Sequence, residues 1–204
     1  MLFTATRSQL PDLVQGVVLP LLRFRYSLTV RSQLDLEQLA GPCIFAANHG
    51  SHLDSLMILA ALPRAQRDRV RIAAAADYWY CSALRRAAAA LFNGFPFPRS
   101  GAAGIKRSIA LLREGRSILI YPAGTRAPRA RFRRGIGLLA AASRCPVIPT
   151  AILGSNLVWP KGQLLPHSGR LTVRFGAPIA IERSLAAGEA TSRIEAAVLA
   201  LAVD

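Results

Sequence analysis

Short apolar runs alternate along this chain with glycine, proline and charged residues. Runs of four to seven apolar residues, bounded by such breaks, are typical of buried strands. We expect strands at 26–30, 42–47, 70–75, 94–97, 117–121, 147–152 and 171–175.

Between several of these runs the apolar residues recur every three or four positions, which indicates helices. In 101–113, for example, Ile105, Ile109 and Leu112 fall on one face, and Gly115 marks the end. We expect helices at 53–62, 77–92, 101–113, 136–144 and 191–203. The alternation predicts an α/β domain with a largely buried sheet and no internal repeat.

An amphipathic helix is expected at 10–25, where apolar residues accompany Arg23 and Arg25 and where Pro20 introduces a bend. Such a helix either lies in a membrane interface or packs on the core of its own domain, and the arginine excess favours the membrane. We therefore divide the chain into a helix at 1–25, a possible interfacial anchor, and a domain at 26–204. We find no apolar run long enough to span a bilayer and no cleavable signal pattern.

Composition narrows the partners. The chain has 204 residues, 52% of them hydrophobic, and a formal net charge of +15. Arginine supplies nearly all of the positive charge, so phosphate groups of anionic lipids or of a phosphorylated cofactor are suitable partners. Nucleic acid is excluded, because the arginines are scattered and no aromatic ladder or zinc-finger spacing accompanies them. The sparse cysteines, Cys43, Cys81 and Cys145, predict reduced core thiols in a cytosolic setting.

A candidate for general-base chemistry follows the strand at 42–47. The sequence Asn48-His49-Gly50-Ser51-His52-Leu53-Asp54 places His49 in a strand-to-helix turn and Asp54 in the first turn of the next helix. There the carboxylate can bind one imidazole nitrogen and leave the other as a proton acceptor.

A capping motif explains part of the same segment, since Ser51 is followed three residues later by an acid. A metal site built from Cys43, His49 and His52 matches no common zinc spacing and lacks a fourth ligand, so no metal is expected.

Two later loops combine arginine with a helix or a glycine turn. Phe95-Pro96-Phe97-Pro98-Arg99-Ser100-Gly101 places Arg99 just before a helix. Tyr121-Pro122-Ala123-Gly124-Thr125-Arg126 joins a flexible glycine, a hydroxyl and a guanidinium. Ordinary turns explain each loop equally well when it is taken alone, and a solvated charge run explains the basic stretch at 129–134 that follows.

The order of these segments resembles the four motif blocks of the glycerolipid acyltransferases of the lysophosphatidic acid acyltransferase (PlsC-like) family. The blocks are 48–54, Phe97-Pro98-Arg99, 121–126 and Val147-Ile148-Pro149-Thr150-Ala151. The resemblance spans roughly 34–178, and four ordered blocks make coincidence improbable.

The resemblance implies a single domain with a mixed, mostly parallel central sheet flanked by helices, as in glycerol-3-phosphate acyltransferase. It implies a catalytic pair, His49 and Asp54, and an acceptor-phosphate site formed by Arg99, Gly124, Thr125 and Arg126, with Asn48, Ser51 and Arg133 as supporting residues. It implies no cofactor; acyl-CoA or acyl-carrier protein is the co-substrate, and a lysophospholipid is the acceptor. The protein is then peripheral, on the cytoplasmic face of a membrane.

His49 would take the proton of the acceptor hydroxyl as the oxygen attacks the thioester, and Asp54 would hold the imidazole, so the acyl group is transferred directly.

One departure from the family leaves an alternative. The family usually has glutamate before Gly-Thr-Arg, whereas this chain has Ala123, which puts the identity of the acceptor in question. A non-catalytic lipid- or phosphate-binding homologue is therefore the alternative, although binding alone does not require His49 and Asp54. A thioesterase is disfavoured because the chain has no Gly-x-Ser-x-Gly, and dinucleotide binding through 135–140 is disfavoured because a basic loop precedes it.

Overall fold

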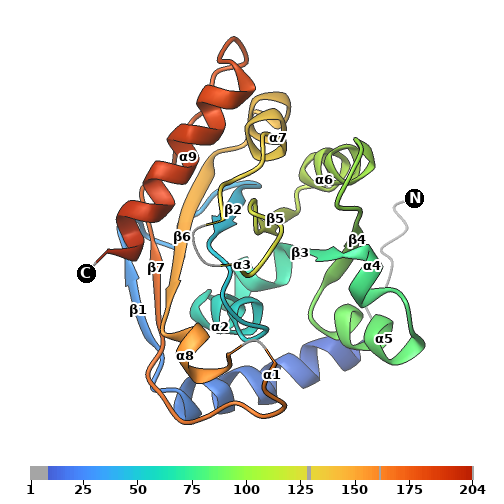
Figure 1. The fold of residues 1–204 in the computed structure, drawn as a ribbon, viewed down its shortest axis with the longest axis vertical. Coiled ribbons are helices and arrows are strands. Elements are labelled where there is room, and N and C mark those ends of the chain that lie inside the picture. The colour runs from blue at the N-terminus through green and yellow to red at the C-terminus, as the bar shows by residue number, and fades with distance from the viewer. Residues whose placement is uncertain (1–8, 128–129, 161, 204) are drawn as a thin grey trace.

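The computed structural model describes residues 9–127, 130–160 and 162–203 (Figure 1). Within them, one sheet has the strand order β1-β7-β6-β2-β5-β3-β4. The strands are β1 (Thr29–Ser32), β2 (Ile44–Ala47), β3 (Val70–Ala75), β4 (Gly94–Phe97), β5 (Ser117–Ile120), β6 (Val147–Leu153) and β7 (Thr172–Phe175). The helices are α1 (Gln9–Arg25), α2 (Asp54–Ala61), α3 (Arg64–Arg69), α4 (Ala76–Trp79), α5 (Ala83–Leu91), α6 (Ala103–Arg113), α7 (Gly135–Ser143), α8 (Ser155–Val158) and α9 (Ala187–Ala202).

The sheet is mixed and mostly parallel, as expected. Only β6 and β7 run antiparallel to each other among the paired strands of the described chain. β2 lies inside the sheet, where Ile44 pairs with Ile118 of β5 on one side and with Val147 of β6 on the other. All four residues of β2 are buried, which explains why its sequence is continuously apolar instead of alternating.

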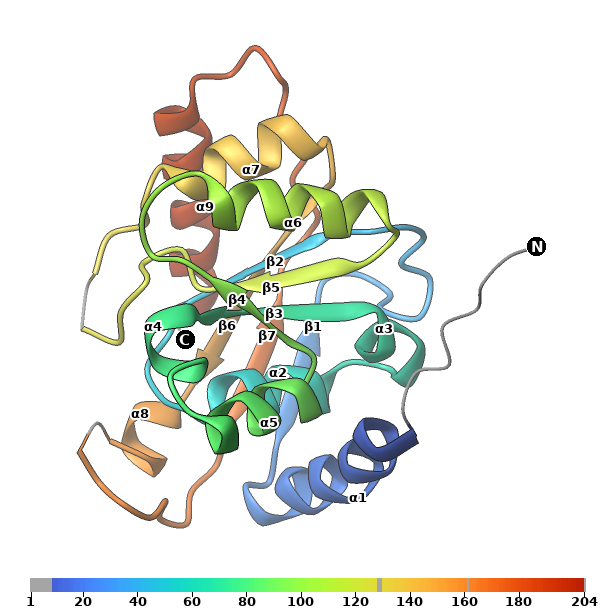
Figure 2. The ribbon, with the colours of Figure 1, turned by 90° about the vertical axis from the view of Figure 1, so that its right-hand side faces the viewer.

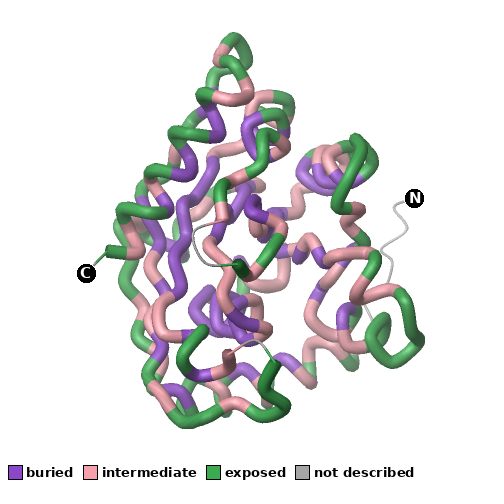
Figure 3. Tube along the Cα trace, viewed as in Figure 1, coloured by how far each residue is buried: buried purple, intermediate pink, exposed green. Residues whose placement is uncertain are grey.

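Helices cover both faces of the sheet. Figure 2 shows α6, α7 and α9 on one face, and α1, α2 and α5 on the other. Each face has its own apolar core, one built around Phe45 and Met57 and the other around Ile118 and Leu139. Figure 3 shows the buried residues concentrated along the central strands and on the inner sides of these helices.

Helix α1 has two apolar faces. Leu19 is fully buried, Gln15 donates from Nε2 to the carbonyl of Leu91 at 2.7 Å, and the helix packs against α2. A second stripe points to solvent and consists of Leu10, Leu13, Val17, Leu21 and Phe24, each at least 55% exposed. The helix therefore packs on the core of its own domain, one of the two alternatives predicted for it, and its outer face stays exposed. Residues 1–8 of the segment predicted at 1–25 lie outside the described residues.

Several predicted boundaries are wrong. The segment at 77–92 is two helices, because Ser82 is extended and its side chain accepts the amide of Arg85, which starts α5. The strand predicted at 26–30 begins only at Thr29, since Ser27 has a φ of 42° in the turn that ends α1. Helices α3 and α8 were not predicted, and α9 begins four residues earlier than expected.

The cysteines also differ from expectation. All three thiols are free, but only Cys43 is buried, and burial raises its pKa to about 11. Cys81 is exposed, so the prediction that every thiol lies in the core is wrong.

Candidate active site

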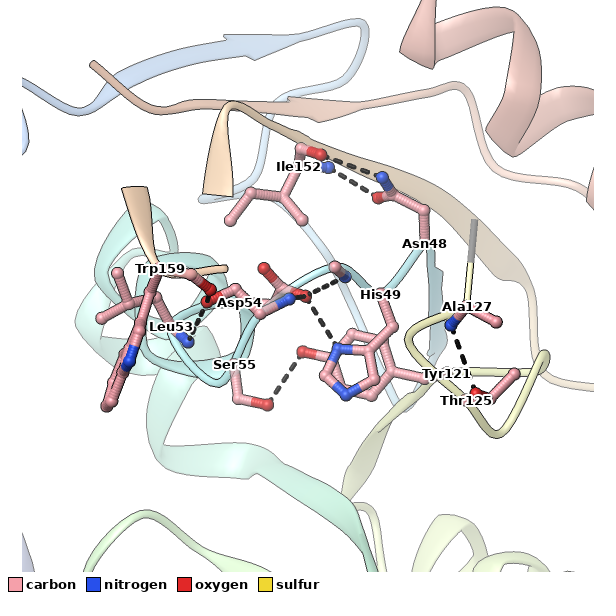
Figure 4. A network of polar contacts seen from close by, with 12 residues as sticks. Asn48, His49, Leu53, Asp54, Ser55, Tyr121, Thr125, Ala127, Ile152 and Trp159 are labelled. Carbon is pink, nitrogen blue, oxygen red and sulfur yellow. Dashed lines mark hydrogen bonds and ion pairs between the residues drawn. The ribbon is translucent and has the colours of Figure 1, made fainter. Parts of the chain in front are cut away.

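The turn that follows β2 carries the candidate base, and the neighbouring strand fixes its position. Asn48 donates from Nδ2 to the carbonyl of Ile152 at 2.9 Å and accepts the amide of Ile152 at 2.8 Å. These two hydrogen bonds to β6 continue the hydrogen-bond pattern of the sheet, and they hold the chain where it turns toward His49 (Figure 4). Asn48 therefore supports the site through the backbone, and it does not line the cavity described below.

His49 and Asp54 meet as the sequence predicts. Nδ1 of His49 lies 2.7 Å from Oδ2 of Asp54, whose side chain is completely buried, whereas the His49 side chain is 21% exposed (Figure 4). A carboxylate only accepts hydrogen bonds, so Nδ1 carries the proton and Nε2 is left with a free lone pair. The pair has the geometry of a general base and its orienting carboxylate.

Backbone amides hold this carboxylate in place. Oδ2 of Asp54 also accepts the amides of Gly50 at 2.7 Å and Ser51 at 2.9 Å. Oδ1 is buried and has no hydrogen-bond partner within the described residues. Asp54 is thus fixed by the turn itself, and its charge is kept from water beside the imidazole.

The predicted capping motif forms only in part, since the N-cap residue of α2 is Leu53 and no side chain caps this helix. The hydroxyl oxygen of Ser51 accepts the amide of Leu53 at 3.3 Å, while Asp54 reaches back to the Ser51 amide. Ser51 also donates to the carbonyl of Trp159 at 3.1 Å, which ties the turn to the segment after α8. One carboxylate therefore holds the turn before α2 and orients the histidine.

Tyr121 packs against the imidazole of His49. Its ring stacks on that of His49, with centroids 4.1 Å apart and planes 21° apart, and its hydroxyl lies 2.8 Å from Oγ of Ser55 (Figure 4). Burial, followed by the charge of Asp54, raises the pKa of Tyr121 well above its ordinary value, so its hydroxyl stays protonated. Tyr121 and Ser55 were not singled out from the sequence; the available signal was an aromatic residue at the end of the strand that precedes the glycine turn.

A cavity of about 680 Å³ opens beside His49, and two kinds of side chain line it. Guanidinium and hydroxyl groups come from Arg99, Thr125, Arg126 and Arg133. Apolar side chains come from β3, from α5 and from the residue after α5, among them Ile72, Ala74, Ala88, Ala89 and Phe92. This lining suits a molecule with an anionic head and an apolar tail.

Arg99 lines the cavity, but its guanidinium is already hydrogen-bonded. Its Nε donates to the carboxylate of Asp77 at 2.9 Å, and its Nη1 donates to the carbonyl of Gly124 at 2.8 Å. The hydrogen bond from Arg99 lowers the pKa of Asp77. The sequence did not reveal Asp77, which lies 22 residues away on α4. Arg99 therefore joins the second and third motif blocks, and only part of its guanidinium remains for a ligand.

The glycine turn has a mainly structural geometry. Gly124 has a φ of 66°, its amide donates to the carbonyl of Tyr121, and its carbonyl accepts from Arg99. Thr125 uses its hydroxyl to accept the amide of Ala127 at 3.2 Å. Arg133 lies over Gly124 and donates from Nη1 to the carbonyl of Arg99 at 3.2 Å. The structure thus gathers all these predicted residues at one wall.

Arg126 is the least engaged of the arginines at this wall. Within the described residues, no hydrogen bond or ion pair holds its guanidinium, and it lines the cavity near His52. Burial, and then the positive charge of Arg126, lower the pKa of His52 to about 4, so this second histidine is neutral at physiological pH. Arg126 is the cation best placed to receive an anion.

Glu195 of α9 anchors the basic loop. Its side chain is 7% exposed, and it accepts the amide of Phe132 at 2.8 Å and Nε of Arg131 at 3.0 Å. Gly137, after this loop, serves packing, since a Cβ at this position would lie 2.2 Å from the carbonyl of Ala187. This close approach of α7 to α9 gives Gly137 a role without a dinucleotide.

Ala123 does not face the cavity. It is buried, with 9% of its surface exposed, and it is not among the lining residues, whereas its neighbours Pro122 and Gly124 are. The methyl group therefore replaces the family's usual carboxylate behind the wall, and the wall itself keeps its arginines.

The histidine–aspartate pair beside a cavity lined by arginines and apolar side chains is a candidate general-base site. Comparisons with known proteins give the family. A family model described as Acyltransferase matches residues 27–153. The chain belongs to this acyltransferase family.

Named relatives agree with this assignment. A 1-acyl-sn-glycerol-3-phosphate acyltransferase of Cocos nucifera is 29% identical over 144 residues, which cover 67% of this chain and 45% of the relative. One of Limnanthes douglasii is 25% identical and covers 85% and 62%, and one of Bacillus subtilis is 30% identical and covers 50% and 48%. The chain thus spans about half to three fifths of the length of these relatives.

A solved structure shares the fold. The 1-acyl-sn-glycerophosphate (LPA) acyltransferase PlsC of Thermotoga maritima superposes with a TM-score of 0.67 at 19% identity, covering 96% of this chain and 82% of the other. This likeness confirms the expected α/β architecture of the acyltransferase domain.

Proposed function

We propose that this protein transfers a fatty acyl group from acyl-CoA or acyl-carrier protein to the free hydroxyl of a lysophospholipid such as 1-acylglycerol-3-phosphate. The observation that carries the proposal is the His49–Asp54 pair, 2.7 Å apart, with His49 lining a cavity that arginines and apolar side chains also line. The names of the relatives support the same acceptor class.

The chemistry follows from the tautomer. With Nδ1 bound to Asp54, Nε2 of His49 accepts the proton of the acceptor hydroxyl as its oxygen attacks the thioester carbonyl. The imidazolium formed is stabilised by the buried carboxylate and by the stacked ring of Tyr121. When the tetrahedral intermediate collapses, the C–S bond breaks and the thiolate takes a proton, which His49 can return. The acyl group passes directly from sulfur to oxygen.

The two kinds of lining residue bind different parts of the acceptor. Arg126 attracts the acceptor phosphate, and Arg99 and Arg133 add positive charge on the same wall. The apolar side chains of β3, β4 and α5 receive an alkyl chain. When both parts of the acceptor are held, its hydroxyl is aligned with His49. The binding energy is thereby used to orient the reacting groups.

The exposed stripe of α1 supports a peripheral position on an anionic membrane. Leu10, Leu13, Val17, Leu21 and Phe24 lie on one side of the helix, and Arg23 and Arg25 stand at its end. This arrangement suits a helix lying in the headgroup region. No helix of the described residues combines the length and the apolarity that crossing a membrane needs. We place the protein on the cytoplasmic face, where anionic lipids gather.

The decisive experiment measures release of thiol. Purified protein with acyl-CoA and lysophosphatidic acid releases free CoA, and His49→Ala lowers kcat by about a hundredfold or more, the usual effect of a general base. The unfolding midpoint of the variant is measured beside it to show that the fold is kept. Wild-type turnover in His49→Ala, or no turnover in either protein with any acceptor or donor, contradicts the proposal and favours a binding protein.

A further inference from the structure

We propose that the loop after α8 is a second membrane-contacting element, in which Leu164 and Leu165 insert into an anionic lipid surface. The proposal rests on the proposed function only in that a lipid acceptor gives such contact a purpose. It concerns residues 162–168, which lie outside the four motif blocks.

The two leucines are placed in water at a cost. Leu164 is 92% exposed and Leu165 is 77% exposed, so neither side chain packs on the domain. Single exposed leucines are common on protein surfaces, but two adjacent ones at the tip of a loop form an apolar point. The free energy is lowered when these two side chains are buried against an apolar partner.

The loop has defined internal hydrogen bonds. Nε1 of Trp159 donates to the carbonyl of Gln163 at 2.8 Å, and the amide of His167 donates to the carbonyl of Val158 at 2.7 Å. The His167 ring also bonds the side chain of Gln163. These contacts close the loop on itself, and so they fix the leucines in an outward position.

The loop and α1 belong to the same end of the molecule. Nη2 of Arg25, the last residue of α1, donates to Oγ of Ser168 at 3.1 Å. Figures 1 and 2 both show this loop and α1 at the bottom of the view. The exposed stripe of α1 and the leucine pair can therefore meet one surface together.

The loop also adjoins the active site. Trp159, at its start, accepts a hydrogen bond from Ser51 and presents its ring to that of His52 with centroids 5.9 Å apart. The start of this loop therefore contacts the turn that carries His49.

Charge decides between a lipid surface and a second copy of the chain. Arg23, Arg25 and Arg170 are exposed near this end, and the whole chain carries +15. Two copies that met here would bring like charges together, whereas anionic headgroups would neutralise them. The occupant that fits is an anionic membrane.

The test compares flotation of the full chain with vesicles of phosphatidylcholine and phosphatidylglycerol. The double variant Leu164→Ser with Leu165→Ser binds about tenfold more weakly or worse, since two apolar insertions are lost. The matched control is Leu199→Ser, a 56% exposed leucine on α9, which binds like the wild type. Equal binding of the double variant and wild type overturns the proposal. So does loss of self-association by the double variant without vesicles, because it assigns the leucines to a second copy.

A second arm separates this proposal from the proposed function. With a short-chain lysophosphatidic acid dissolved below its aggregation limit, the double variant keeps wild-type turnover, while its turnover on vesicle-embedded acceptor falls. Absence of turnover in the wild type refutes the acyltransferase proposal, yet the flotation result still decides the role of the leucines. Equal loss of turnover on both acceptors contradicts the loop proposal.

Discussion

The ring of Tyr121 lies flat against the imidazole of His49, at 4.1 Å between centroids and 21° between planes. The phenol is held from the far side by Ser55, which shares a hydrogen bond of 2.8 Å with its hydroxyl. The imidazole of His49 is thus held at Nδ1 by Asp54 and on one ring face by Tyr121. An aromatic face stabilises an adjacent cation, and in the proposed mechanism His49 becomes a cation when it takes the acceptor's proton.

Replacing Tyr121 tests this contact. Tyr121→Leu is expected to lower kcat by about tenfold, because the imidazolium loses its aromatic face. Tyr121→Phe keeps the ring and loses only the bond to Ser55, so it stays within a few fold of the wild type. Steady-state kinetics with a saturating donor measure both. A fall of equal size in the two variants would assign the effect to the hydroxyl and not to the stacked ring.

Arg126 is predicted to bind the acceptor phosphate. Arg126→Ala should lower kcat/KM for lysophosphatidic acid by about tenfold or more and leave the KM for acyl-CoA little changed. Arg113→Ala is the matched control, since it removes the same charge from an exposed position on α6 outside the cavity lining. A phosphate-free acceptor should be insensitive to Arg126→Ala, and an equal loss with that acceptor would exclude phosphate binding.

His52 makes the fold sensitive to acid. Its pKa is about 4 in the folded protein, against 6.5 for the ordinary group, so the unfolded chain binds more protons between these values. Stability is therefore retained above about pH 6.5 and decreases as the pH falls toward 4. His52→Phe, which keeps an aromatic ring, should lose about 1 kcal/mol less than the wild type between pH 7 and pH 5, allowing for partial exposure. Urea unfolding at the two pH values measures this, and parallel losses would contradict it.

The outer stripe of α1 should govern membrane attachment. Leu13→Ser combined with Val17→Ser is expected to weaken flotation with anionic vesicles by about tenfold or more while the unfolding midpoint stays near that of the wild type, since both residues are exposed. Leu199→Ser again serves as the control. Substitution is a sharper test than deletion up to Arg25, because deletion also removes the buried Leu19. Unchanged flotation would show that the exposed stripe of α1 does not contribute to membrane binding.

Local pattern was enough to predict the sheet and the contact between His49 and Asp54. The strands at 94–97 and 70–75 have the predicted bounds, because short apolar runs between breaks have few other structures available. The His49–Asp54 contact was also predictable, since it spans one tight turn. Both features depend on residues close together in the sequence.

Contacts between distant segments were not predictable in the same way. The pairing of Arg99 with Asp77 depends on how β3 and β4 bring α4 beside the second motif block. Likewise, the outward direction of Leu13 and the inward direction of Leu19 depend on where α2 packs, since both residues are apolar. Side-chain chemistry indicates which groups can interact, and the fold decides which of them meet.

The carboxylate of Glu195 ties α9 to the loop that bears Arg133. The family match ends at residue 153, yet the amide of Phe132 and Nε of Arg131 are held by a residue 42 positions beyond that limit. A fragment trimmed to the matched region would keep His49, Asp54 and Arg126 and lose the tether of the loop that bears Arg133. Selection for the proposed phosphate-binding residues would therefore act on α9 as well as on the motif blocks. Domain boundaries drawn from the family match would separate Glu195 from the loop that it holds.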